Sequence, residues 1–459
     1  MKKKSILLVL FGLILGLSVA YAAELIKAKE VSFSNGKSGL KASNVQSAIE
    51  ELYNKNISET SCKNVSVPKL VEGLVPVTID GDGTVTYADT SENWYNYCDK
   101  RWANAVILED GASYKTGDII QESDIQSYFV WIPKYKYKLW NVDSPSKGVH
   151  EIEIVFDETD TTDIEGVSCK TPMTSGESGN CNNGEYMTHP AFISMNTNGF
   201  WVGKFETGYK GATSAATAQI NANDTSKVII KPNVYSWRNI TVYNAFLASY
   251  NYDRDLDSHM MKNTEWGAVA YLSHSKYGIN REININNNSS YKAGYSALPS
   301  TNQQTYPGTS GDGATYNSAY NTEIGYLAST TGNISGIYDM NGGAWEYVAG
   351  YISDNLGLSG FNTTTIAEYN QKYFDIYGTS SGDNTYQNRI LGDATSEVGP
   401  FNNYFSSWYS EVAYFVSSGG PWFYRGGNIN VGSYGGLYFF HRYTGNVYND
   451  DGFRIILTP

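Results

Sequence analysis

The alternation of apolar and polar positions predicts strands in two stretches of the chain, and helical spacing predicts helices in two more. Apolar side chains alternate with polar ones over residues 128–139 and again over 200–207, as they do in half-buried strands. Apolar positions recur at helical spacing in 239–248 and 263–272. Residues 282–335, rich in Asn, Ser, Thr, Gly and Tyr, predict long surface loops.

A further helix is predicted near the N-terminus, within residues 23–60, which we interpret as a helical stalk. Ser43 or Asn44 is placed to cap it. A single short helix must bury its apolar stripe, either on its own chain or in a bundle with other copies. Both alternatives stay open, and the second makes residues 43–53 a homo-oligomer contact. The stripe consists of Val45, Ala48, Ile49, Leu52 and Tyr53.

Residues 61–125 have the pattern of a small β-rich module. Strand-like runs at 75–79 and 84–87 flank the sequence Asp-Gly-Asp-Gly at 80–83. This sequence predicts a hairpin turn, because a calcium loop needs later oxygen ligands and a terminal Glu that are missing here. The strands and helices that follow predict an α+β domain over 126–459.

The first residues have the organisation of a secretory signal peptide, predicted to span 1–22. Lysines at 2–4 precede an apolar run over 6–19, and Ala-Tyr-Ala at 20–22 supplies the small residues of a cleavage site. The protein is therefore expected to be secreted or held at the cell surface. An uncleaved membrane anchor is the alternative, although the apolar run is short for a membrane span.

The composition excludes two classes of protein. The 459 residues include 38 Tyr and 45 Gly, with 17% charged residues and a formal net charge of -13. The aromatic side chains supply enough apolar area to form cores, which excludes disorder. No basic face is visible, so nucleic acid is not an expected partner. The acidic surplus either keeps the protein soluble or attracts cations and basic partners.

The cysteines predict disulfides outside the C-terminal part of the chain. An even number of cysteines in an exported protein indicates disulfide bonds, and four allow three pairings. Locality favours pairing the first with the second and the third with the fourth. The four are Cys62, Cys98, Cys169 and Cys181.

Four motifs occur in the order found in one protein family. Residues 336–348, Gly-Ile-Tyr-Asp-Met-Asn-Gly-Gly-Ala-Trp-Glu-Tyr-Val, resemble the Gly-Leu-x-Asp-Met-x-Gly-Asn-Val-Trp-Glu-Trp signature of the formylglycine-generating-enzyme (sulfatase-modifying-factor) family. Residues 261–266, 425–427 and 452–454 resemble that family's Leu-Pro-Thr-Glu-Ala-Glu-Trp, Arg-Gly-Gly and Gly-Phe-Arg motifs. The resemblance covers 126–459 and implies a C-type-lectin-like fold.

The motif residues are expected to have structural roles. Arg425 and Arg454 are expected to pair with carboxylates or carbonyls inside the fold. Glu346 either caps backbone donors or, near Asn341, ligates a structural calcium ion, as the corresponding region does in some relatives. The expected scaffold residues are Trp345, Glu346, Trp422, Arg425, Gly426, Gly427, Gly452, Phe453 and Arg454.

The chemistry of the resembled family is not expected in this chain. Formylglycine formation uses a late pair of cysteines that bind copper, and the related sulfoxide synthases use a histidine iron site. This sequence has no cysteine after Cys181, and its histidines lack the i, i+4 spacing of a metal pair. We therefore expect no enzyme, and no cofactor other than structural calcium.

The segment 421–454 resembles the variable region of proteins diversified by retroelements, such as phage tropism determinants. In such variable regions, Asn codons change into codons that cannot encode Lys, Glu, Gln, Met or Trp. None of these five residue types occurs in this chain from Asn428 to Asp451. Tyr438 and Phe440 are assigned to the scaffold. The alternative is a Tyr- and Asn-rich loop that is not diversified. The expected ligand-binding positions are Asn428, Ile429, Asn430, Val431, Tyr434, Phe439, His441, Tyr443, Thr444, Asn446, Val447, Tyr448, Asn449, Asp450 and Asp451.

These observations together predict an exported, non-catalytic display protein that binds an unknown protein or cell-surface ligand through a diversified C-terminal face. Two alternatives are a fixed surface adhesin and a structural protein of the phage-fibre type. A formylglycine-type oxidase ranks lower because the cysteines are missing. A sugar-binding lectin also ranks lower, because the Glu-Pro-Asn and Gln-Pro-Asp calcium motifs are absent.

Overall fold

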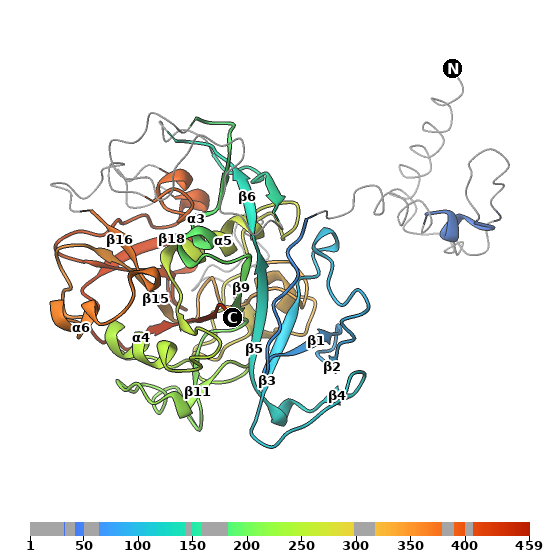
Figure 1. Ribbon diagram of the computed structural model, residues 1–459, viewed down its shortest axis with the longest axis horizontal. Helices are drawn as coiled ribbons and strands as arrows, with labels where there is room; N and C mark the ends of the chain where they lie inside the picture. Colours follow the sequence, from blue (N-terminus) through green and yellow to red (C-terminus); the bar gives the residue numbers. More distant parts are fainter. Residues whose placement is uncertain are drawn as a thin grey trace. The chain divides into compact units, whose positions relative to one another are not determined.

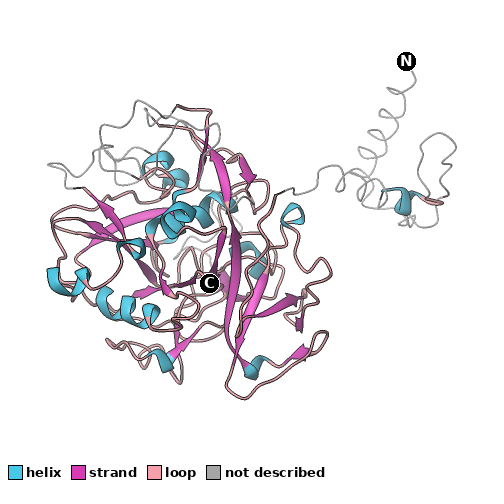
Figure 2. Ribbon diagram, viewed as in Figure 1, coloured by secondary structure: helices cyan, strands magenta, loops and turns pink. Residues whose placement is uncertain are grey.

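A computed structural model gives the structure of the chain in two compact units, residues 1–61 and 62–459. Each unit is described by itself. The protein is mostly β-structure with a few short helices (Figure 2). In the part of the chain that the structure describes, no helix is long and apolar enough to cross a membrane. The described residues are 32, 42–49, 64–142, 148–157, 182–297, 317–378, 390–399 and 407–459.

The described part of the first unit contains a helix over 45–49. Asn44 caps it, since its Oδ1 accepts hydrogen bonds from the Ser47 backbone N–H at 2.8 Å and the Ser47 hydroxyl at 2.9 Å. Ala48 is buried, whereas Ile49 is 51% exposed. The rest of the predicted helix and the signal peptide lie outside the described residues, so the stalk and its role in oligomerisation stay predictions.

An eight-stranded antiparallel sheet runs through the second unit (Figure 1). Its order is β12-β20-β9-β5-β3-β1-β2-β4, which brings a strand from the end of the chain between two from its middle. The strands are β1 (Val75–Ile79), β2 (Val85–Tyr87), β3 (Asn104–Leu108), β4 (Ile119–Ile120), β5 (Ile125–Pro133), β9 (Gly199–Gly203), β12 (His259–Met260) and β20 (Ile455–Leu457).

The predicted boundary after residue 125 was wrong. The hairpin of β1 and β2 forms as expected, with Val77 opposite Tyr87. However, β3 pairs with β1 on one edge and with β5 on the other, so the β-rich segment continues directly into the larger domain. Val106 of β3 is completely buried. Strand pairing between segments is not visible in local periodicity, which shows only that each segment is a strand.

A second, five-stranded sheet carries the C-terminal motifs. Its central strand β15 (Trp345–Ile352) pairs antiparallel with β17 (Trp422–Gly426) and parallel with both β16 (Asp375–Tyr377) and β19 (Asp451–Phe453). The strand β18 (Gly436–Tyr443) pairs with β17. On its other side, the backbone of residues 412–414 exchanges hydrogen bonds of 2.9 and 3.0 Å with Phe440.

Smaller elements complete the second unit. The sheet β7-β6-β8 uses β6 (Tyr135–Lys138), β7 (Ile154–Phe156) and β8 (Tyr186–Thr188). Two-stranded pairs are β10 (Gly208–Tyr209) with β11 (Val228–Ile229), and β13 (Tyr295–Ala297) with β14 (Asn317–Ala319). The α-helices among the described residues of this unit are α3 (Pro190–Met195), α4 (Val242–Tyr250), α5 (Asn263–Ser273) and α6 (Thr363–Ala367).

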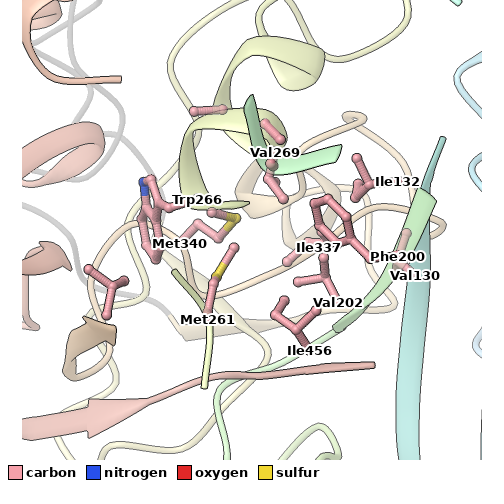
Figure 3. Packing of buried hydrophobic residues seen from close by; sticks show 14 of the residues in the cluster. Val130, Ile132, Phe200, Val202, Met261, Trp266, Val269, Ile337, Met340 and Ile456 are labelled. Carbon is pink, nitrogen blue, oxygen red and sulfur yellow. The ribbon is translucent and has the colours of Figure 1, made fainter. Parts of the chain in front are cut away.

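The helix α5 is the centre of the hydrophobic core. Each of its residues is buried, so the helix is covered on all sides rather than on one face. Figure 3 shows Trp266 and Val269 of this helix near Met340 and the β-sheet residues around Val202. Trp266 also donates its indole N–H to the Leu437 carbonyl at 2.8 Å, which fixes the start of β18 on the core.

Candidate functional site

The strand β18 presents different residues on its two faces. In its register with β17, Tyr424 stands opposite His441 and Phe423 opposite Arg442. Because side chains alternate along a strand, Phe439, His441 and Tyr443 share one face of the sheet. We call this face, together with Trp345 and Tyr424 of the neighbouring strands, the aromatic face.

Ring contacts join the aromatic face from its buried to its exposed end. Trp345 contacts Phe439 and Tyr424 with ring centroids 4.9 and 4.8 Å apart. Tyr424 stacks on His441 at 5.1 Å. Tyr443 then contacts Tyr448 at 5.2 Å, and Tyr448 is 53% exposed. Burial lowers the pKa of His441, so the rings offer an uncharged surface at neutral pH.

The opposite face of β18 belongs to the core. Tyr438 and Phe440 are each only 1% exposed. The Tyr438 hydroxyl donates to the Ala270 carbonyl of α5 at 3.3 Å, and the Arg425 guanidinium lies 5.7 Å from the Phe440 ring. Their assignment to the scaffold agrees with these positions.

The fifteen predicted ligand-binding positions divide into three groups by exposure. Exposed side chains are those of Asn430, Tyr434, Tyr448 and Asn449. Partly exposed side chains are those of Val431, His441, Tyr443, Thr444, Asn446, Val447 and Asp450. Four positions are buried, contrary to the prediction of an accessible face: Asn428, Ile429, Phe439 and Asp451.

The buried positions hold the site together instead of facing solvent. The Asn428 amide donates to the Asp450 carboxylate, which also accepts the Trp345 indole N–H at 3.1 Å. Asp451 lies in β19, beside Trp345 of β15, and burial raises the pKa of its carboxyl group well above the usual value. Each contact joins residues far apart in the chain, so codon composition alone could not separate these positions from the exposed ones.

Neighbouring residues fix the candidate loops mainly through main-chain atoms. The Tyr347 hydroxyl donates to the carbonyl of Asn446 at 2.9 Å, and the Arg238 guanidinium donates to the carbonyl of Asn449. The Trp345 backbone N–H donates to the Asp450 carbonyl at 2.8 Å. These bonds do not depend on the side chain carried by the acceptor residue. Side chains at 446 and 449 can therefore change while their anchors remain, whereas the Asp450 carboxylate itself holds Asn428 and Trp345.

The two scaffold arginines lie inside the fold. Arg454 donates to the two carboxylate oxygens of Glu346 at 2.9 and 2.5 Å, and to the carbonyls of Gly203 and Tyr338. Arg425 donates to the Asn263 side chain at 3.2 Å and to several carbonyls.

The other scaffold positions line the same interior. Trp422 and Phe453 are buried, and Gly426 and Gly427 have positive φ, which permits a turn after β17. Gly452 pairs with Glu346 in the parallel register of β15 and β19.

Of the two residues predicted near a calcium ion, Glu346 has both carboxylate oxygens bound, whereas the side-chain oxygen of Asn341 accepts no hydrogen bond, so the calcium site stays a prediction. Arg454 occupies both oxygens of Glu346, and the Asn341 amide donates to the Ile283 carbonyl at 2.8 Å. Among the described residues, no group of three or more His, Cys, Asp and Glu side chains is placed to hold a metal ion. Cys98 is disulfide-bonded. The other three cysteines lie outside the described residues, so the pairing stays a prediction.

Comparisons with known proteins leave the family open. No protein-family model and no curated protein match the sequence. Among solved structures, the chain is similar to the Major Tropism Determinant P3c variant, with 12% identity over 86% of this chain and 74% of that chain, at a TM-score of 0.24. The I1 variant gives 11% identity over 86% and 96%, also at 0.24. A TM-score of 0.24 does not establish a family relationship, so membership of the formylglycine-generating-enzyme family stays a prediction.

Proposed function

We propose that the protein is an exported, non-catalytic binding protein with a C-type-lectin-like C-terminal domain. Its binding site consists of the exposed part of the aromatic face and the loops at 428–434 and 444–450. The observation that carries this proposal is the main-chain anchoring of the second loop. The side chains of Tyr347 and Arg238 hold the carbonyls of Asn446 and Asn449, and the Trp345 backbone N–H holds that of Asp450. Recognition through the side chains at 446 and 449 can therefore change without loss of the loop conformation.

The chemistry of the exposed side chains suits protein or surface ligands. Tyr434 and Tyr448 are 46% and 53% exposed and provide large, amphipathic contact areas with little rotamer entropy to lose. Asn430 and Asn449 add amide donors and acceptors beside them. The chain has no cysteine after Cys181, which supports a binding role over the copper chemistry of the resembled family.

We further propose that a retroelement diversifies this site. The test is to sequence the locus and search for an imperfect repeat of codons 421–454 beside a reverse-transcriptase gene. Mismatches opposite template adenines should fall on codons of exposed residues such as Tyr434 and Tyr448. They should not fall on the codon of the buried residue Phe439. A uniform 3′ end across a population, with no repeat, would refute diversification and leave a fixed adhesin or a fibre-type structural protein.

A second experiment tests binding itself. One displayed library randomises the exposed positions Asn430, Tyr434, Tyr448 and Asn449, and a matched library randomises four buried residues of β17 and β18. Protease resistance should persist in most members of the first library and be lost in the second. Selection of the first library on biotinylated lysozyme should enrich specific binders. If both libraries lose protease resistance equally, the proposed site is not a tolerant surface.

A further inference from the structure

Two adjacent aspartates lie beside the aromatic face without a balancing cation. The Asp450 carboxylate accepts the Trp345 indole N–H at 3.1 Å, and Asp451 stands opposite Trp345 in the parallel register of β19 and β15. Asp450 Oδ1 and Asp451 Oδ2 are buried without hydrogen-bond partners, which is rare for carboxyl oxygens. Among the described residues, no lysine, arginine or histidine forms an ion pair with either aspartate. These residues therefore leave the negative charge of the pair unbalanced.

The two aspartates share one negative charge at neutral pH. Asp451 is 3% exposed, and burial, followed by the charge of Asp450, raises the pKa of its carboxyl group well above the usual value. Asp451 is therefore protonated. Asp450 accepts N–H groups from Trp345 and Asn428, and an ionised carboxylate is the stronger acceptor of such bonds. The remaining charge thus lies on Asp450, in contact with the indole of Trp345.

Two arginines around this surface are bound elsewhere. Arg238 donates to two backbone carbonyls and lies over the Tyr291 ring at 3.7 Å, and it forms no ion pair with Asp450. The Arg442 guanidinium lies 4.5 Å from the Tyr414 ring, beyond the outer edge of β18. The strands β15, β17 and β18 separate that edge from β19, which carries the aspartates. The positive charge that balances Asp450 is therefore left for a ligand to supply.

Accessible aromatic rings continue from this charge to the solvent. Trp345 and Tyr443 are partly exposed, and Tyr448 is 53% exposed. Tyr424 joins the first two, with its ring 4.8 Å from Trp345 and 6.2 Å from Tyr443, and Tyr443 meets Tyr448 at 5.2 Å. The faces of aromatic rings attract cations, and a hydrogen bond to a charged acceptor polarises the indole of Trp345 in the same sense. The surface is therefore suited to a positive group.

We propose that these rings and Asp450 bind an arginine side chain of a protein ligand. The proposal rests on the binding site proposed above and names the chemical class of its ligand. A planar guanidinium can lie against aromatic rings, as Arg254 does over Tyr250 at 3.6 Å within this protein. Its charge balances Asp450 by attraction over a distance, so the guanidinium needs no contact with the buried oxygen. Neutral glycans supply no such charge.

Saturation-transfer NMR on the full chain tests the proposal with two matched small molecules. Acetyl-arginine amide carries a guanidinium, and acetyl-citrulline amide has nearly the same shape with an uncharged urea group. The wild-type chain should bind the arginine compound at least about 5-fold more tightly. Tyr448→Leu removes an exposed ring and Asp450→Asn removes the charge, so each should reduce this preference to below about 2-fold. Asp255→Asn removes the same charge at an exposed position elsewhere and should retain the preference.

Thermal unfolding of each variant shows whether its fold is retained. If Asp450→Asn unfolds early, Tyr448→Leu decides the question, because its ring is exposed and its loss leaves the core intact. Equal binding of the two compounds by the wild-type chain would overturn the proposal, as would a preference that persists in Tyr448→Leu. Binding of methyl glucoside without a preference for arginine would also overturn it and indicate a sugar ligand. Lysozyme binders selected from the library of exposed positions would then show that the site stands and only the ligand class is wrong.

Discussion

Replacing Phe439 by alanine tests whether this position belongs to the core or to the binding surface. The ring is completely buried and contacts Trp345 and Tyr424 at centroid distances of 4.9 and 6.0 Å. Truncation removes the transfer free energy of the ring and about 0.5–1.5 kcal/mol for the aromatic contacts. The cavity would collapse poorly because hydrogen bonds to Asp450 hold Trp345 in place. The free energy of unfolding should therefore fall by about 3–5 kcal/mol.

Equilibrium urea unfolding followed by tryptophan fluorescence measures this loss. Asn449→Ala is the matched control, because its side chain is exposed and its carbonyl keeps the bond from Arg238. The control should change the free energy of unfolding by no more than about 0.5 kcal/mol. A loss below about 1 kcal/mol for Phe439→Ala would show that the ring is accessible, and Phe439 would return to the ligand-binding positions.

Three further predictions concern the interior. Arg454→Met leaves Glu346 buried without its ion-pair partner and should cost about 3–5 kcal/mol in urea unfolding; adding Glu346→Gln should recover part of this loss, and an additive double variant would contradict the ion pair. Burial lowers the pKa of His189 from 6.5 to about 3, so as the pH falls this imidazole is protonated in the unfolded chain before it is protonated in the folded chain. Stability should therefore fall as pH drops below about 6.5, by at most about 1.4 kcal/mol per pH unit, and His189→Asn should flatten this slope in urea unfolding at pH values between 7 and 4. Reduction of the Cys98 disulfide should lower the free energy of unfolding by about 2–5 kcal/mol, and unchanged unfolding in dithiothreitol would contradict a stabilising role.

Local patterns located elements but not the burial of individual side chains. Tyr438 and Phe440 were assigned to the scaffold and are buried, but so is Phe439, which was assigned to the ligand-binding positions. Helical spacing at 263–272 located α5 at Asn263–Ser273. Nothing in the spacing showed that this helix is buried on all sides, because that depends on elements packed around it from distant parts of the chain.

Non-local contacts account for what the sequence missed. Asn428 appeared as a variable surface residue, yet its amide is bound by Asp450 from the next loop. Strand β3 lies within 61–125 but pairs with β5, which extends beyond the predicted boundary, so composition could not place that boundary correctly.

The backbone pairing of residues 412–414 with Phe440 has a consequence for solubility. A strand with a free edge can recruit strands from other molecules, and this hazard grows when its side chains become more apolar. At Phe440 the outer edge of β18 is already paired through N–H and C=O groups of Val412 and Tyr414. These bonds use no side-chain atoms. New side chains on the aromatic face can therefore arise without opening the strand to intermolecular β-pairing at that point.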